Sequence, residues 1–151
     1  MNVLTGLLTI NDIDPYVEYG AFLAEDKAGD TKNYSSLLKP SAVKPQKEVS
    51  FREQDGAKVP EVIVQQLQPR DVSLQFAIVA ADRTEFSERY SAFLRMLQRG
   101  EGGWLDFYFP ELNRHFRMFY KEATDYKQLT DFEGEVAGKF YVKFREPEPA
   151  F

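Results

Sequence analysis

The chain has 151 residues, a net charge of −5 from 24 acidic and 19 basic residues, and no cysteine. Without cysteine it can form neither a disulfide nor a thiolate zinc site, and an acidic chain without a basic block is not expected to bind nucleic acid specifically. The first residues lack the pattern of a secretory signal, and no apolar run approaches the roughly 20 residues of a membrane span. We therefore expect a soluble single domain over residues 1–151, because a chain of this length can bury about two thirds of its unfolded surface.

Two short strands are expected at the start of the chain. Residues 3–11 alternate weakly between apolar and polar side chains and end in a turn-prone segment, in which Pro15 favours an extended backbone at Asp14. Residues 16–23 also alternate, with Gly20 inside the pattern. Because a glycine within a strand usually marks a bulge or a close approach of backbone, Gly20 is expected to have a structural role.

Residues 24–59 predict a long arm or insertion, because charged residues, glycine and proline dominate this stretch and apolar residues are scattered. A loop of more than about 15 residues is uncommon in a compact domain and usually has a function or contacts a partner. The candidate subunit-contact residues are Tyr34, Leu37, Leu38, Val49 and Phe51. A turn signal at 55–56 predicts a small hairpin between residues 49–53 and 59–64, and residues 62–67 are expected to form an apolar face that leads into the next strand. A surface excursion without a function is the alternative for the arm.

A strand followed by a long helix forms the centre of the predicted fold. Residues 71–81 alternate cleanly and predict a half-buried strand. Asp82 and Glu85 have the spacing of a capping box, and Gly100 is suited to end a helix, so a helix is expected over about residues 83–99. Its apolar stripe consists of Phe86, Tyr90, Phe93, Leu94 and Leu97. At 1.5 Å per residue this helix would be about 25 Å long, enough to cover one face of a sheet.

The last third of the sequence predicts further strands. Residues 104–109 and 114–122 predict a β-hairpin, with Trp104 in the core. Residues 126–130 predict another short strand. Residues 136–146 alternate between apolar and basic side chains and predict a strand with one buried and one solvated face. The remaining residues at the end of the chain are expected to be irregular.

No catalytic, cofactor or metal site is expected. His115 is the only histidine, and no cysteine or second histidine exists to complete a metal site or a serine-type triad. Carboxylate pairs at 12–14 and 133–135 lie in turn-like segments and do not match the twelve-residue calcium loop. The glycine-containing runs match neither the P-loop nor the dinucleotide fingerprint. Acid–base catalysis by an ordinary Asp or Glu stays open, because environment tunes their pKa, but no residue supports it.

Aromatic residues are numerous, with 13 Phe, 8 Tyr and one Trp. Aromatic side chains fill strand surfaces well, so a sheet core is the favoured explanation. An alternative is a small-ligand or carbohydrate-binding β module whose open aromatic cleft includes Trp104, Tyr108 or Tyr120. The fold class that follows from the predicted elements is α+β, mainly β and antiparallel, with one principal helix at about 83–99.

The order of the elements resembles that of small phage and prophage tail proteins. The resemblance rests on the pattern INxIDxYxxYGxFL over residues 10–23, a long excursion, RDVxLxF over 70–76, FxxxYxxFL over 86–94, and a closing aromatic hairpin. The family that it resembles is the N-terminal domain of siphophage distal tail proteins. That family implies the tail-tube type of fold, an antiparallel β-sandwich or split barrel with one helix packed alongside.

The resemblance also implies a function. It suggests a non-enzymatic structural protein of the virion tail, made in the bacterial host cytoplasm. Such a protein forms or joins a homo-oligomeric ring, a hexamer in this family, between tail tube and hub, and contacts other tail proteins. A closed ring needs two different complementary surfaces on each subunit, and residues 24–59 are the candidate for one of them. An acidic charge would suit a channel in which DNA slides without sticking. The sequence has no C-terminal carbohydrate-binding-like domain of the kind many distal tail proteins carry, which puts contact with a host receptor in doubt.

Overall fold

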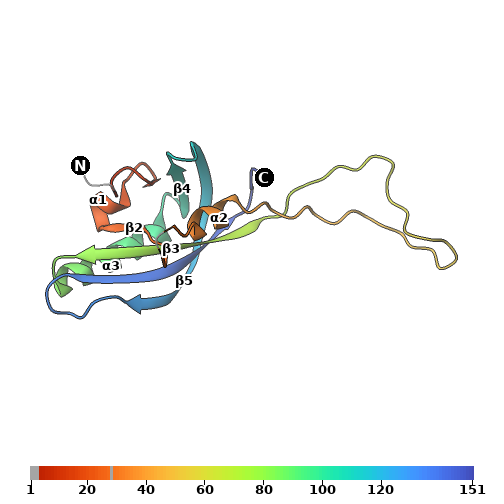
Figure 1. Ribbon diagram of the computed structural model, residues 1–151. Coiled ribbons are helices and arrows are strands. Elements are labelled where there is room, and N and C mark those ends of the chain that lie inside the picture. Colours follow the sequence, from red (N-terminus) through yellow and green to blue (C-terminus); the bar gives the residue numbers. More distant parts are fainter. Residues whose placement is uncertain (1–3, 28) are drawn as a thin grey trace.

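The computed structural model describes residues 4–27 and 29–151, which fold around one curled antiparallel sheet (Figure 1). The elements are β1 (Thr9–Ile10), α1 (Pro15–Tyr19), β2 (Ala21–Leu23), α2 (Lys32–Leu38), β3 (Arg70–Ala80), α3 (Arg83–Arg99), β4 (Trp104–Phe109), β5 (Arg114–Gln128) and β6 (Val136–Glu146). The six strands lie in the order β1-β4-β5-β6-β3-β2. The expected α+β, mainly β class is confirmed. A two-sheet sandwich is not confirmed, because all strands of the described residues belong to this one sheet, which curls like half of a barrel.

The centre of the sheet is the antiparallel pair β3 and β6, which stays in register from Arg70 opposite Glu146 to Ala80 opposite Val136. Strand β6 alternates along its whole length as the sequence predicts, so one side chain in two points into the core. Strand β3 is not half-buried as expected, because residues 74–78 are all buried and α2 packs on its other face. The inward residues of β6 are Val136, Gly138, Phe140, Val142 and Phe144, and its outward residues include Lys139, Lys143 and Arg145. The prediction of one buried and one basic face is therefore confirmed.

Helix α3 has the predicted bounds and packs its apolar stripe against the inner face of the sheet. The ring centroids of Phe93 and Phe76 lie 5.1 Å apart in an edge-to-face contact. At the start of the helix the carboxylate of Asp82 accepts a hydrogen bond from the backbone N–H of Glu85, 2.8 Å away. The Glu85 side chain forms an ion pair with Arg89 instead of returning to Asp82, so half of the predicted capping box forms.

The strand predicted over residues 16–23 is wrong for its first part, because Pro15–Tyr19 form a helical turn and only Ala21–Leu23 pair with β3. Asp14 caps this turn by accepting a hydrogen bond from the backbone of Tyr16 (3.0 Å). Gly20 ends it in the left-handed conformation, at φ +65°. Of the two expected roles of Gly20, the close approach of backbone is confirmed, because an added Cβ would lie 2.6 Å from the carbonyl oxygen of Val79, and the bulge is not. Helix-capping residues at both ends outweigh an alternation of only five residues.

The strand predicted over residues 3–11 shortens to Thr9–Ile10, and residue 3 lies outside the described residues. The β4–β5 hairpin is confirmed, and its second strand extends to Gln128, so that the separate strand predicted at 126–130 becomes part of it. Two register shifts, between Tyr120 and Glu122 and between Thr124 and Lys127, bend this long strand.

Trp104 is not a core residue as expected. The alternation of β4 buries Leu105, Phe107 and Phe109, so Trp104 lies half-buried on the outer face of the sheet. There the guanidinium carbon of Arg117 lies 3.8 Å from the centroid of its ring. The end of the chain is also more ordered than expected, because the ring of Phe151 packs against the guanidinium groups of Arg70 and Arg114.

Candidate functional site

Residues 40–69 leave the body of the molecule as a long hairpin, which we call the projecting hairpin (Figure 1). Near its base the backbone N–H of Gln68 donates to the carbonyl of Ala42 over 2.8 Å. Near its tip Val49 and Lys58 exchange two backbone hydrogen bonds of 2.8 and 2.7 Å. This single bridge closes the chain around the turn signal at 55–56, but the predicted pairing of residues 49–53 with 59–64 does not extend beyond it.

The structure separates the five predicted contact residues into two groups. Tyr34 and Leu37 lie on α2, which packs on the body, and the Leu37 side chain is 0% exposed and unavailable to a partner. Leu38, at the end of the same helix, is exposed. Val49 and Phe51 lie near the tip of the projecting hairpin with 45% and 51% of their surface exposed. The stretch 24–59 is thus not one arm, because its first part belongs to the body.

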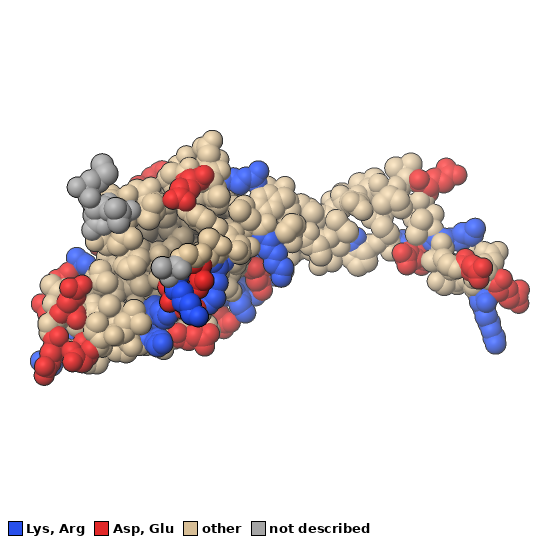
Figure 2. Space-filling model, viewed as in Figure 1, with Lys and Arg blue, Asp and Glu red and all other residues tan. Residues whose placement is uncertain are grey.

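The projecting hairpin exposes more apolar surface than the sequence suggests. Its exposed large apolar side chains are Val43, Val49, Phe51, Val59, Val62, Ile63 and Val64. The last three belong to the segment expected to lead an apolar face into the sheet, yet Val62 is 76% exposed. Four basic and four acidic residues leave the hairpin neutral, and Figure 2 shows charged side chains gathered at its far end. Contiguous exposed apolar side chains usually mark an interaction surface.

A buried ion pair fixes the base of the projecting hairpin. The Nε of Arg70 donates to Oε1 of Glu146 over 2.6 Å, and both side chains are almost fully buried. The same guanidinium donates to the carbonyl of Lys39, on the other limb of the hairpin base. The backbone N–H of Ser41 donates to the carbonyl of Phe151. Both limbs are therefore attached to the end of β6 and to the end of the chain.

Where β2 does not pair with β3, side chains of α2 accept hydrogen bonds from the backbone of β3. Oδ1 of Asn33 accepts a hydrogen bond of 2.7 Å from the backbone N–H of Gln75, and Oγ of Ser36 accepts one of 3.2 Å from Ser73. Asn33 also donates to the carbonyl of Ala24. An edge whose N–H groups are already bonded does not accept an added strand.

The opposite edge is closed in a similar way. Oδ1 of Asn11 accepts a hydrogen bond of 2.8 Å from the backbone N–H of Asp106, and its amide nitrogen donates to the carbonyl of Trp104. The pairing of β1 with β4 covers the rest of this strand. Strand addition to these parts of β3 and β4 is therefore disfavoured, and the projecting hairpin is the more accessible element.

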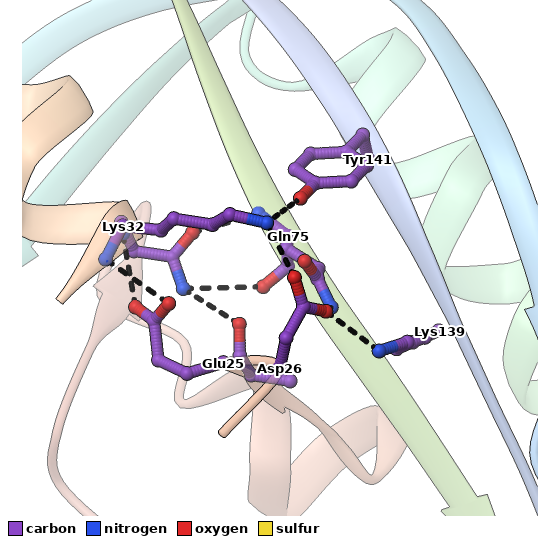
Figure 3. Close-up of polar contacts among 8 residues, drawn as sticks. Glu25, Asp26, Lys32, Gln75, Lys139 and Tyr141 are labelled. Carbon is purple, nitrogen blue, oxygen red and sulfur yellow. Dashed lines mark hydrogen bonds and ion pairs between the residues drawn. The ribbon is translucent and has the colours of Figure 1, made fainter. Parts of the chain in front are cut away.

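A cluster of ionic side chains fastens the segment before α2 to the outer face of the sheet (Figure 3). The carboxylate of Asp26 pairs with Lys139, at 2.7 Å, and with Lys32. The hydrogen bond from Lys139, followed by the one from Lys32, holds the pKa of Asp26 well below its usual value. Lys32 also donates to the hydroxyl of Tyr141 over 2.6 Å. The members of this cluster satisfy one another, so the cluster is best explained as a structural fastening.

The histidine and the aromatic candidates contact neighbouring side chains. His115 is exposed, with its Nδ1 3.1 Å from the carboxylate of Asp106, and its ring stacks on Tyr108 at 4.5 Å. Arg117 covers a face of Trp104, and Tyr120 packs against the core. Within the described residues no group of three or more possible metal ligands occurs, and no helix is both long and apolar enough to cross a membrane.

An apolar cleft of about 220 Å³ lies between α1, β2 and α2. Its apolar lining includes Leu7, Leu8, Pro15, Phe22, Leu23 and Tyr34. Its charged lining residues are all acidic, namely Asp14, Glu25, Asp30 and Glu111. Burial, together with a hydrogen bond to Glu111, raises the pKa of Tyr34 to about 12. The carboxylates give the cleft a negative rim.

Comparison with known proteins supports a phage-tail type of fold. No protein-family model matches the sequence, and no curated protein matches it significantly. Among solved structures, the chain is similar to the Dit protein (gp 19.1) of phage SPP1, described as a paradigm of the hub adsorption apparatus in phages that infect Gram-positive bacteria. The TM-score is 0.54 and the sequence identity 15%, over 93% of this chain and 50% of that protein. The chain thus spans half the length of the Dit chain, and the similarity concerns the fold alone.

Proposed function

We propose that this chain is a non-enzymatic structural component of a phage or prophage tail tip, which forms or joins a ring between the tail tube and the hub. The observation that carries the proposal is the projecting hairpin, a neutral element with a row of exposed apolar side chains. The fold similarity to the SPP1 Dit protein, which belongs to a hub, supports the same function. In this proposal residues 1–151 act as one domain whose partners are other copies of the chain and other tail proteins.

The division of the molecule into a body and a projecting hairpin suits a ring. In a closed ring every subunit presents two different surfaces that fit each other, and an extended element is one common way to supply one of them. The side-chain hydrogen bonds to the uncovered parts of β3 and β4 favour the projecting hairpin for this contact over pairing between two sheets. Val49 and Phe51, among the predicted contact residues, are exposed on it. A hexamer is the stoichiometry that the family resemblance implies.

The charge distribution fits a tail protein through which DNA passes. Because the projecting hairpin is neutral, the net charge of −5 belongs to the rest of the chain. A ring of such bodies would surround its channel with negative charge, which repels the DNA backbone and lets it slide. We accordingly propose that the chain is located in the virion tail and does not bind nucleic acid specifically.

The proposal is tested by replacing residues 43–67 with a short Gly-Ser linker. The limbs are already joined by a hydrogen bond of 2.8 Å between Gln68 and Ala42, so a short linker can close the gap without strain on the body. We expect light scattering over a concentration series to show an oligomer for the natural chain and a monomer for the shortened one. As the control, the natural and the shortened chain should unfold at the same temperature. A natural chain that stays monomeric at high concentration, or a shortened chain that still assembles, would contradict the proposal.

A further inference from the structure

We infer that the tip of the projecting hairpin docks in the acid-rimmed apolar cleft of a second copy, with Phe51 inserted between α1 and α2 of that copy. The inference rests on the proposed function, because it needs copies of the chain to associate. It goes further by naming both halves of the contact. Each copy would donate one hairpin tip and accept another, which is the head-to-tail arrangement that closes a ring.

One face of the hairpin tip combines apolar and basic side chains. In an extended chain alternate residues share a face, which groups Phe51 with Val49 and Lys47. Lys58 is the hydrogen-bonded partner of Val49 on the opposite limb, so its side chain lies on this same face. Both charged residues of the face are thus basic, although the projecting hairpin as a whole is neutral.

The cleft has the complementary character. Its walls are apolar, and its volume of about 220 Å³ exceeds the about 150 Å³ of an apolar cavity that holds benzene, so it has room for the ring of Phe51. Its four carboxylates have no salt-bridge partner within the described part of the chain. Asp14 accepts backbone hydrogen bonds from Gly6 and Tyr16, and Glu25 accepts them from Lys32 and Asn33, so their charges are held at the rim without a cationic side chain. A rim of unneutralised acids around an apolar cleft fits an apolar side chain flanked by lysines.

The geometry favours docking in another copy over docking within one chain. The projecting hairpin points away from the side of the body on which α1 and β2 lie (Figure 1). Its base is held in this direction by the Arg70–Glu146 pair. The limb from Val43 to Phe51, before the chain turns, spans about 26 Å when extended, which is comparable to the about 25 Å of the 17-residue helix α3, so a hairpin can reach onto a neighbouring body.

Disulfide trapping tests the contact, because the natural chain has no cysteine. Phe51→Cys and Leu7→Cys are made in separate chains, since Leu7 is exposed and lines the cleft. When the two variants are mixed and oxidised with copper phenanthroline, we expect a disulfide-linked dimer that contains one chain of each kind. Ser50→Cys is the matched control, because this exposed neighbour of Phe51 lies on the opposite face of the limb. A cross-link that is absent, or that is as strong with Ser50→Cys, would overturn the inference.

Two further outcomes are informative. A chain that carries both Phe51→Cys and Leu7→Cys and becomes cross-linked only within itself would show that the hairpin docks on its own body, which also overturns the inference. A charge exchange gives independent support. Lys58→Glu should weaken association about tenfold. Adding Asp30→Lys should restore most of it, because residues 58 and 30 then again carry opposite charges. If the natural chain assembles and the shortened chain does not, but no Phe51–Leu7 cross-link forms, the proposed function stands and the cleft is not the docking site.

Discussion

Asn33 and Gln75 meet at the edge of β3, where the side-chain amide of Asn33 bonds to the backbone of Gln75 in place of a neighbouring strand. The carbonyl oxygen of Asn33 accepts the backbone N–H of Gln75 at 2.7 Å, and its amide nitrogen lies 3.5 Å from the carbonyl of the same residue. Asn33 is almost fully buried, although it lies in a polar stretch of the sequence. One side chain therefore satisfies the edge of the sheet and attaches α2 to it.

Asn33→Ala should lower the free energy of unfolding by about 2 to 3 kcal/mol, because it leaves the buried N–H of Gln75 without an acceptor. Urea unfolding followed by circular dichroism measures the change. Ser35→Ala on the exposed side of the same helix is the control, and it should change stability by less than about 0.5 kcal/mol. Equal effects of the two substitutions would mean that the Asn33 contacts do not stabilise the edge.

Gly20→Ala should be more destabilising than Gly102→Ala, although the two glycines have nearly the same φ, +65° and +62°. At Gly102 a methyl group meets open space, so only the left-handed backbone is penalised, by about 1 to 2 kcal/mol. At Gly20 the methyl carbon would lie 2.6 Å from the carbonyl oxygen of Val79, a backbone atom of β3. We expect a loss of about 3 kcal/mol or more, measured by thermal or urea unfolding. The clash would be ruled out if the two variants were equally stable.

Glu146→Gln should destabilise the fold by about 3 kcal/mol, because it leaves the buried guanidinium of Arg70 without its counter-charge. The double substitution Arg70→Met with Glu146→Leu should cost less than this single one, since it removes both charges together. Asp71→Asn is the matched control, because the neighbouring pair Asp71–Arg145 is about one third exposed and should contribute less than about 1 kcal/mol. Unfolding free energies from urea titration decide between these expectations.

Asp26 should stay ionised to lower pH than an unperturbed aspartate, whose pKa is 3.8. A depressed pKa in the folded state adds stability at every pH above 3.8, and this stability is lost as the pH falls from there through the folded-state pKa. The stability difference between the natural chain and Asp26→Asn should therefore be constant near neutral pH and shrink in acid. Carboxyl-detected NMR titration gives the midpoint directly.

The lysine partners of Asp26 provide the control for this titration. Lys139→Met should raise the midpoint of Asp26 more than Lys32→Met does, because the hydrogen bond from Lys139 is the larger cause of the shift. An Asp26 midpoint at or above 3.8 in the natural chain would show that the cluster in Figure 3 does not form in solution.

Long periodic segments allowed the predictions that are confirmed. Strands β3 and β6, with 11 residues each, and helix α3, with 17, carry several repeats of their pattern, and α3 also has capping residues at both ends. Helix α1 has only five residues, which fit a strand pattern as well as a helix. The signal that could have found it is the combination of Asp14 and Pro15 before the turn and Gly20 after it.

The contacts that shape the candidate site could not be predicted because they join residues far apart in the chain. Asn33 and Gln75 are separated by 42 positions, and Arg70 and Glu146 by 76. The cleft combines acidic residues from three separate segments, so its rim has no signature in the sequence. The burial of Leu37 likewise depends on its position in the folded core and not on its neighbours in the chain.

The attachment of the projecting hairpin to β3 determines how the fold would respond to a pulling force. The returning limb continues directly into β3, which is paired with β6 over its whole length from Arg70 to Ala80 (Figure 1). Tension along that limb would act parallel to the strands and load all their perpendicular hydrogen bonds at once, a shear geometry in which the bonds cannot open one after another. The first side chains to carry the load would be those of Arg70 and Glu146. A hairpin anchored in this way can act as a mechanical tether as well as a contact surface.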